Sequence, residues 1–475
     1  LLLCARDGGF RRLLRHPQIR KGGLFLIALF GGCQLKADPA LPVVKRVQAD
    51  SLAIQQVVYN DRVAPFNTLA RDFVQKIYGR PSFHRITPEQ VVSSWMLYPE
   101  EWNRTPIIRI KNQELRTALG LKEEYASLNH LFDGTQYKLQ PLWQREQGNR
   151  SKLAQAIQET DEKVGLILML RQGTLIRPLP PDVTPLSTQK VNAELWYNRI
   201  PFSKILFMVN LTLGFAAFGL FMFRMLTGRK EKAVSRRVWG TTLCLTTLFH
   251  ATGYALRGYI RGGFPLSNGY ETMQFVALAV LLTACLLQRR FPFTRPFGFL
   301  LSGFTLLVAY LGEMNPQITP LMPVLASPWL SWHVSLIMIS YGLFAFTFLN
   351  GILALCLIGK QKNTASPITG EQIEQLTLLS RLLLYPGTFL LGIGIVLGAV
   401  WANVSWGSYW SWDPKEVWAL ITMLVYALAL HPASLKWFRY PMFFHVFGIV
   451  AFLTVLITYF GVNFLLGGMH SYANG

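Results

Sequence analysis

Residues 401–431 read WANVSWGSYWSWDPKEVWALITMLVYALALH. A loop with closely spaced tryptophans leads into an apolar run that ends on His431. Tryptophan is enriched where membrane helices meet the lipid headgroups. Asp413 followed by Pro414 is a favourable helix start, with Asp as N-cap and Pro in the first helical position. We therefore expect a transmembrane helix that begins directly after a tryptophan-rich loop at the membrane surface.

Seven further apolar stretches follow residue 200, whereas the charged residues crowd the first 200 positions. The chain of 475 residues is 51% hydrophobic and 15% charged, against roughly a quarter charged in soluble domains. Several stretches reach the roughly 20 residues that a bilayer requires. The predicted spans are 204–226, 238–260, 272–288, 296–312, 333–358, 382–401, 416–431 and 441–466. Residues 201–475 are thus predicted to form a polytopic α-helical membrane domain with eight transmembrane helices.

Positive charge predicts the orientation of these helices, because Lys and Arg are concentrated in short cytoplasmic loops. One set of alternate loops holds fourteen basic residues, namely Arg224, Arg229, Lys230, Lys232, Arg236, Arg237, Arg289, Arg290, Arg295, Lys360, Lys362, Arg381, Lys436 and Arg439. The other set holds three, namely Arg257, Arg261 and Lys415. We expect the first set to be cytoplasmic, so residues 40–200, the 401–416 loop and the C-terminus lie outside.

The first 200 residues divide at about residue 39. Residues 1–39 hold a short apolar run, 23–33, after a basic stretch, which is typical of a truncated anchor or a signal-like segment. Residues 40–200 predict an extracytoplasmic mixed α/β domain. Thr87-Pro88-Glu89-Gln90 is a helix start with a capping-box pattern, and we expect that helix to reach about Leu97. Further helices are expected over 68–78 and 152–160, and a short strand over 107–110.

The tryptophan loop has the composition of a binding platform. An aromatic belt at the headgroups would explain the rings alone. It would not explain why they stand in a fixed WGxxWxWDPxE pattern with glycine and acidic residues. A planar macrocycle with carboxylate groups needs flat apolar faces to stack against and a helix start nearby. We therefore predict a platform for a planar macrocycle, which the resemblance described next implies to be haem, made of Trp401, Trp406, Gly407, Trp410, Trp412, Asp413 and Glu416.

This pattern closely resembles the WWD signature of the haem-handling proteins of cytochrome c biogenesis, and its WDPKE…LH continuation resembles the CcsA (ResC) branch of System II. Residues 249–275 resemble the second helix of that family with its SNGYE loop, and residues 468–473 (GMHSYA) resemble its C-terminal motif. Residues 40–200 resemble part of the periplasmic domain of the CcsB (ResB) partner, fused in front as in CcsBA synthases. The resemblance implies a bacterial inner (cytoplasmic) membrane, with the loop and C-terminus periplasmic.

Three histidines are the predicted ligands of haem iron. His333 begins the fifth span and His470 follows the eighth, so both flank the tryptophan loop, and neutral imidazole is a common axial ligand. The resemblance implies the same pair. His431, at the predicted cytoplasmic end of the seventh span, matches a transmembrane ligand of the family and implies a second, inner site. The partner of His431 is left open between His445, His250 and an N-terminal helix that precedes this sequence.

The resemblance implies haem transport to the outer face and covalent attachment of haem to the CxxCH motif of apocytochrome c. The cofactor would be b-type haem, bound non-covalently and transiently. His333 and His470 would act in the synthase reaction by holding the haem vinyl groups against the cysteine thiols, which is catalysis by positioning. The expected partners are apocytochrome c, thiol-reducing proteins that keep CxxCH reduced, and a separate or upstream CcsB/ResB-like segment.

Three other functions are compatible with a membrane protein that has a tryptophan-rich loop. A System I type WWD haem-handling protein, a b-haem electron-transfer membrane protein and a transporter of another substrate remain alternatives. The net charge of +21 would suggest nucleic acid in a soluble protein, but much of the excess lies in loops that set orientation, so no nucleic-acid partner is expected. The five cysteines form no CxxC or CxxCH motif, which excludes a CxxC redox dithiol and haem attachment to the chain itself.

Overall fold

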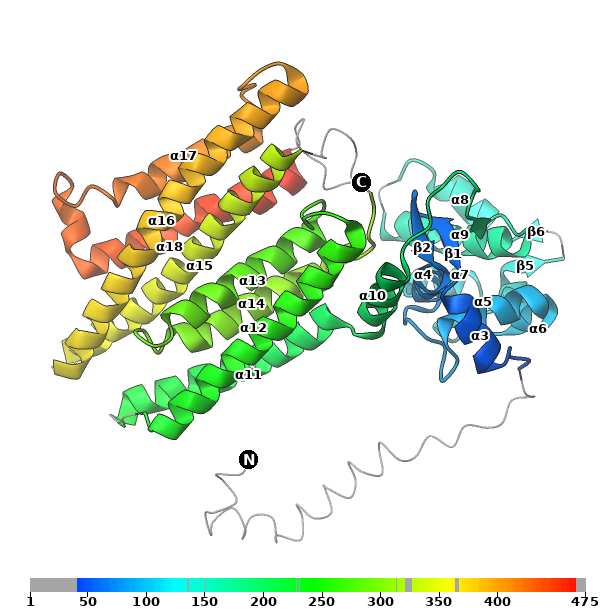
Figure 1. Ribbon diagram of the computed structural model, residues 1–475, viewed down its shortest axis with the longest axis horizontal. Coiled ribbons are helices and arrows are strands. Elements are labelled where there is room, and N and C mark those ends of the chain that lie inside the picture. The colour runs from blue at the N-terminus through cyan, green and yellow to red at the C-terminus, as the bar shows by residue number, and fades with distance from the viewer. Residues whose placement is uncertain are drawn as a thin grey trace, which may run out of the picture. The chain divides into compact units, whose positions relative to one another are not determined.

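Figure 1 shows the computed structural model, which describes residues 41–466 apart from 135, 150, 228, 230, 313, 321–326 and 364–366. The predictions for residues 1–39, for His470 and for 468–473 fall outside the described residues. The chain folds as two compact units, one with residues 41–49 and 74–172 and the other with residues 50–73 and 173–466. The domain border predicted at residue 200 stays a prediction.

The first unit is a mixed α/β structure, as expected. Its elements are α5 (Pro88–Leu97), α6 (Pro99–Arg104), α7 (Gln113–Ala118), α8 (Leu139–Glu146), α9 (Lys152–Arg171), and the antiparallel pairs β3 (Ile108–Arg109) with β4 (Tyr125–Ala126) and β5 (Phe132–Asp133) with β6 (Gln136–Tyr137). The capping box of α5 is present, with Thr87 and Gln90 bonding each other's backbone amides. Trp95 and Trp102 are fully buried in the core, 5.8 Å apart between ring centroids. The predicted helix at 152 is confirmed but extends beyond its predicted end at about 160.

Two elements span the border between the units, α3 (Arg46–Ala53) and α4 (Phe66–Tyr78). The second unit also holds a three-stranded antiparallel sheet, β2 (Arg62–Pro65), β1 (Gln56–Tyr59) and β7 (Arg177–Pro178), with α10 (Thr188–Arg199) after it. Asn60 and Asp61 have φ of 50° and 56°, as a tight hairpin between β1 and β2 requires. Arg62 pairs with the buried Glu194 and donates to the carbonyl of Ile318 at 2.9 Å, which ties the sheet to the segment that contains Ile318.

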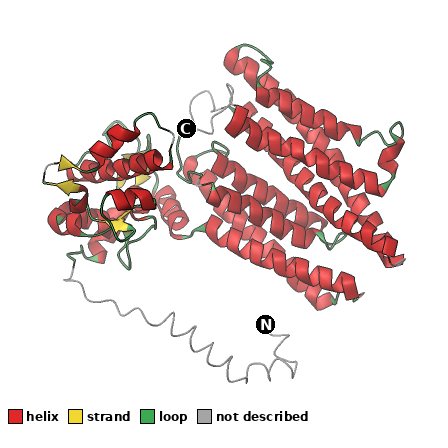
Figure 2. Cartoon of the chain, turned by 180° about the vertical axis from the view of Figure 1, so that it is seen from behind, coloured by secondary structure: helices red, strands yellow, loops and turns green. Residues whose placement is uncertain are grey.

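The rest of the second unit is a bundle of long helices (Figure 2). They are α11 (Phe202–Thr227), α12 (Ala233–Arg261), α13 (Gly269–Leu287), α14 (Thr294–Leu311), α15 (Pro328–Asn363), α16 (Pro367–Trp406), α17 (Pro414–Leu428) and α18 (Pro441–Leu456), with the 3₁₀-helix η4 (Lys436–Arg439) and the π-helix η5 (Ile457–Leu466). Six of them are long and apolar enough to cross a membrane, all but α12 and α17. The chain is therefore a multi-pass membrane protein, as the predicted fold class has it, whereas the predicted spans at 238–260 and 416–431 are not among these six and stay predictions.

Helix α16 begins about 15 residues before the predicted span at 382. Its first turns are amphipathic: Ile373, Leu376 and Leu379 are buried while Glu371 and Gln375 lie on the other face and bond each other. A count of consecutive apolar residues misses such a segment, because only one face of the helix is apolar. The predicted span 382–401 lies within this helix, and the amphipathic start of the helix was not predicted for that reason.

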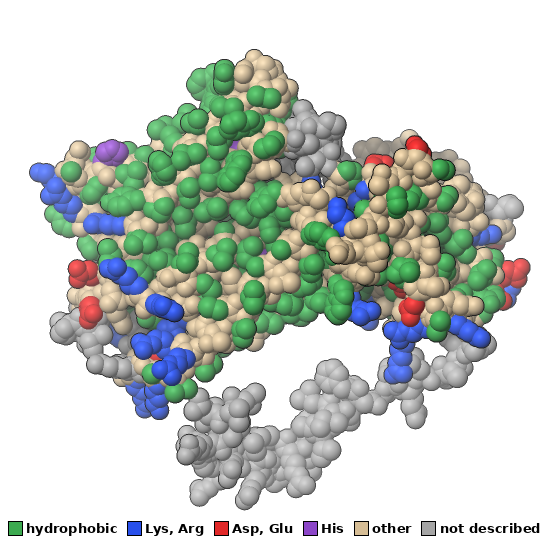
Figure 3. Space-filling model, viewed as in Figure 1, with side chains coloured by type: hydrophobic (Ala, Val, Ile, Leu, Met, Phe, Trp, Pro, Cys, Tyr) green, Lys and Arg blue, Asp and Glu red, His purple; other side chains and the backbone are tan. Residues whose placement is uncertain are grey.

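Figure 3 shows apolar side chains over the bundle, while Lys and Arg gather at the end where α11 turns into α12 and α15 turns into α16. Lys232, Arg236 and Arg237 are exposed there. This basic end is the one that the sequence predicts to be cytoplasmic. The opposite end carries the tryptophan loop.

Helices α11 and α14 pack through small residues. A Cβ atom added to Gly303 would lie 2.8 Å from Cγ and 2.9 Å from the backbone N of Leu211, whereas one added to Gly219 would meet nothing within 4 Å. Backbone atoms cannot move aside as a side chain can. Gly303 therefore lets the two helix backbones approach closely.

We predict that Gly303→Ala forces α11 and α14 apart and destabilises the bundle by about 1–3 kcal/mol, as overpacking does. The measurement is the thermal unfolding midpoint of the purified protein in detergent. Gly219→Ala is the matched control, and should be neutral or slightly stabilising because Ala favours a helix. Equal midpoints for the two variants would contradict the close packing.

Candidate functional site

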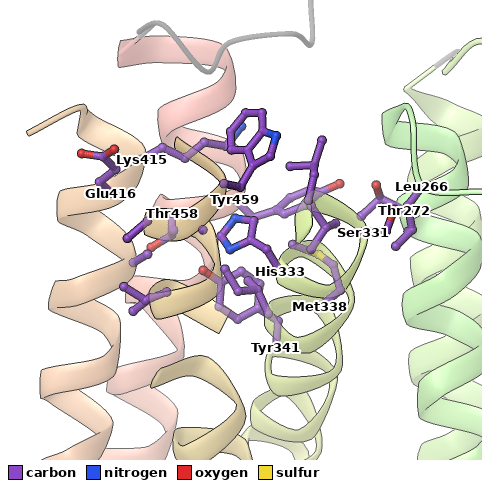
Figure 4. A pocket seen from close by; sticks show the side chains of 18 of the residues that line it. Leu266, Thr272, Ser331, His333, Met338, Tyr341, Lys415, Glu416, Thr458 and Tyr459 are labelled. Atoms are coloured by element: carbon purple, nitrogen blue, oxygen red, sulfur yellow. The ribbon is translucent and has the colours of Figure 1, made fainter. Parts of the chain in front are cut away.

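A cavity of about 270 Å³ opens at the end of the bundle that carries the tryptophan loop. It is walled by α13, α15, α16, α17, η5 and the turn before α13 (Figure 4). Its lining is mostly apolar, with a few polar groups from separate helices, as is usual for small-molecule sites. The residues most relevant to chemistry are His333, Tyr341, Trp401, Trp410, Lys415 and Thr458.

His333 lies on the first turns of α15, at the centre of the cavity in Figure 4. Its Nδ1 is 2.6 Å from the carbonyl oxygen of Gly394 on α16. A carbonyl only accepts, so Nδ1 carries the hydrogen and the lone pair of the neutral ring is on Nε2. The imidazole is therefore fixed in the tautomer that can coordinate a metal through Nε2.

The His333 ring fits between α15 and α16 because Gly398 has no side chain. A Cβ atom added to Gly398 would lie 2.5 Å from both Cε1 and Nδ1 of His333, and one added to Gly394 would lie 2.7 Å from Cγ1 of Ile337. Gly394 and Gly398 form a small-xxx-small pair, the spacing that lets two membrane helices pack closely. Neither glycine was among the predicted site residues, although their spacing is visible in the sequence.

The predicted platform tryptophans divide into two groups. Trp401 and Trp410 line the cavity, whereas Trp406 and Trp412 are absent from its described lining. Trp406 packs edge-on against the buried Trp401 at 4.7 Å. Trp412 contacts Trp410 at 5.9 Å with its own side chain 73% exposed. Trp412 has φ of +59°, a strained backbone for a residue with a side chain.

The predicted platform residues Gly407, Asp413 and Glu416 shape the loop itself. Gly407 ends α16 with φ of +79° and donates to the carbonyl of Asn403. Asp413 caps α17 as predicted, accepting from the Lys415 amide at 2.9 Å. Glu416 completes a capping box and accepts from the Ser411 amide at 2.9 Å and the Asp413 amide at 3.3 Å. Of these three, Glu416 alone belongs to the described cavity lining.

The remaining candidate histidines occupy different surroundings. His431 is exposed beyond the end of α17, with Nδ1 2.9 Å from the Ala427 carbonyl. His445 is buried in α18 and bonds Oγ1 of Thr377 at 2.9 Å. His250 is buried in α12, 3.1 Å from Oε1 of Gln274. An inner iron site at His431 stays a prediction, and so does the choice of its second ligand.

A buried charge cluster fixes the turn before α13. Two of its members, Arg257 and Arg261, entered the prediction only as loop charges that set the orientation. Glu271 is 1% exposed and accepts from Arg257 at 2.8 Å, Arg261 at 2.7 Å and the Ser267 amide and hydroxyl at 2.7 Å each. Arg257 also donates to the carbonyls of Pro316 and Gln317. Ser267 lines the cavity. The signal was available, because a charge within an apolar helix usually has a partner.

The chain is similar in sequence to a family of cytochrome c assembly proteins and to several individual proteins. The model of the family described as cytochrome C assembly protein matches residues 266–470. The chain is 33% identical over 485 residues to Protein NrfI of Wolinella succinogenes, which covers 87% of this chain and 53% of NrfI. It is 34% identical over 298 residues to the cytochrome c biogenesis protein CcsA of a Synechococcus species, which covers 55% of this chain and 95% of that protein. The CcsA of Guillardia theta is 37% identical over 274 residues. The chain spans about half the length of NrfI.

We predict that Gly398→Ala displaces the His333 imidazole and lowers the affinity for added haemin about tenfold or more, because the new methyl group would overlap the ring. Affinity is measured from the Soret band during titration of the purified protein. Gly392→Ala is the matched control in the same helix, since its Cβ would only touch Sδ of Met423 at 3.4 Å. Haemin binding by Gly398→Ala at the level of the control would show that the ring position does not matter.

Proposed function

The chain belongs to the cytochrome c assembly protein family, and from this premise we propose that it binds haem in the described cavity and attaches it to the CxxCH motif of apocytochrome c. It would act as a System II type synthase. The alignment with NrfI covers 87% of this chain, so it extends into the region before residue 200. That extent favours a fused CcsBA-like arrangement over a System I component.

The observation that carries this proposal is the setting of His333. Its imidazole is held by the Gly394 carbonyl with the lone pair on Nε2, in a cavity that also presents Trp401 and Trp410. Imidazole ligates haem iron, and indole faces stack on flat rings. His470 is the proposed second axial ligand, so the haem would be b-type, non-covalent and bound only until transfer.

The proposed reaction needs no acid–base machinery from the protein. Each cysteine thiol adds across one haem vinyl group: a C–S bond forms, and the thiol hydrogen goes to the other vinyl carbon, so no oxidant is consumed. Holding the reactants in contact can supply several kcal/mol of the barrier. The histidine of CxxCH would replace one of the two protein ligands as the product forms.

We assign the tryptophan loop and the cavity to the periplasmic side of a bacterial inner membrane. The exposed basic residues at the other end of the bundle (Figure 3) support this assignment by the positive-inside rule. Apocytochrome c would then reach the cavity from the periplasm, with its cysteines kept reduced by thiol-reducing proteins. His431 would belong to an inner site that receives haem first, with an upstream or separate CcsB-like segment as partner.

We predict that the double variant His333→Ala, His470→Ala loses maturation of a reporter cytochrome c in cells that depend on this protein, and that added imidazole restores part of it by filling the vacated ligand positions. The measurement is haem-stained holocytochrome. His84→Ala, an exposed histidine of the first unit, is the control and should mature the reporter normally. Full maturation by the double variant without imidazole would refute the ligand assignment.

Steady quinol oxidation by the purified protein would instead favour an electron-transfer function.

A further inference from the structure

Charge is distributed unevenly over the cavity walls. Among the described lining residues, Lys415 is the only Lys or Arg and Glu416 the only carboxylate. The carboxylate of Glu416 is used by the loop, where it accepts from the backbone of Ser411 and Asp413. Figure 4 shows the two side chains leaving α17 in opposite directions, with Lys415 extending toward the indole above His333 and Glu416 pointing away. Among the described lining residues, the positive charge therefore lies on the α17 wall, beside the capping carboxylate of Asp413.

The residues that line the wall across the cavity from Lys415 are uncharged, and the cluster of Arg257, Arg261 and Glu271, which bonds Ser267, contributes no residue to the described lining. This wall is formed by the turn into α13 and the start of α15, which present Ser267, Asn268, Thr272 and Ser331. Figure 4 shows Thr272 and Ser331 on the side of His333 opposite to α17. These hydroxyl and amide groups can accommodate an uncharged substrate group, but they cannot neutralise a carboxylate.

Haem has a matching asymmetry. Two of its pyrrole rings carry propionates, and the two across the macrocycle carry the vinyl groups. A carboxylate in a partly desolvated cavity is costly unless it is paired with a cation. The propionate half would therefore bind on the side of the cation, and the vinyl half would point to the neutral wall.

We propose that Lys415 binds a haem propionate and thereby turns the vinyl groups toward the wall formed by the turn before α13 and the start of α15, where the thiols of CxxCH would meet them. This inference rests on the proposed function and assigns the orientation of its substrate. The cavity of about 270 Å³ lies just below the usual 300–1,000 Å³ of ligand pockets. The mostly apolar lining suits the macrocycle, and Lys415 suits one of its carboxylates.

The first test compares haem with haem dimethyl ester, in which both propionates are neutral. Purified full chain and variants are titrated with each compound, and the ratio of the two affinities is the readout. We expect Lys415→Met to reduce the preference for haem about tenfold relative to the unsubstituted chain, and Lys415→Arg to keep it. Lys436→Met, which removes a lysine from η4 outside the cavity lining, should also keep it.

The outcomes separate the two levels of the proposal. Failure of the unsubstituted chain to bind either compound would overturn the proposed function. Binding of both compounds by Lys415→Met with an unchanged ratio would overturn the propionate assignment and leave the proposed function standing. Because the ratio is taken within each variant, a general loss of affinity from misfolding cancels and does not imitate the expected result.

The second test locates the vinyl edge with an introduced thiol. Ser331→Cys places a thiol on the neutral wall, and Ala419→Cys places one on α17, on the same wall as Lys415. Incubation with reduced haem should give a thioether in Ser331→Cys, seen as the shifted pyridine haemochrome band of c-type haem and as haem that stays with the denatured protein. Ala419→Cys should bind haem without a thioether. The reverse pattern would overturn the proposed orientation.

Discussion

The close approach of α15 and α16 at Gly394 and Gly398 is the constraint on which the site depends. A methyl group at Gly398 would overlap the His333 ring, and the ring reaches the Gly394 carbonyl only because the helices are this close. The contact therefore sets three properties at once: the position of the imidazole, its tautomer and one wall of the cavity. A histidine in a loop would have neither its ring position nor its tautomer fixed in this way, because a loop lacks the close contact between two helix backbones.

The other walls are held by polar groups that pair before any ligand arrives. Glu271 binds Arg257, Arg261 and the turn at Ser267, and Asp413 with Glu416 caps α17 and braces the tryptophan loop. In a low-dielectric environment an unpaired charge is strongly unfavourable, so each network has few alternative arrangements. These pairings hold the turn before α13 and the start of α17 in place, and Trp412 keeps its strained backbone in the loop between them and α16.

Much of this arrangement could be predicted from the sequence, because the signals were local. The helix starts at Thr87 and Asp413 follow from capping chemistry, and the spans follow from long apolar runs. His333 stood out as a histidine at the end of a span. The early start of α16 was not predictable by counting apolar residues, and the division of the tryptophans depends on the turn at Gly407. The spacing of Gly394 and Gly398 indicates close helix packing, but it does not specify that the partner is His333, about 60 residues away in sequence.

The partner of His333 also bears on how long a haem would stay bound. A ligand histidine whose other nitrogen donates to a carboxylate gains basicity and binds its metal more firmly. Here Nδ1 donates to a neutral carbonyl, which orients the ring but adds no charge. An electron-transfer site benefits from permanent ligation, whereas a synthase must give up its substrate when the histidine of CxxCH competes for the iron. An imidazole that is well oriented by a neutral carbonyl suits the ligand exchange that the proposed synthase reaction requires.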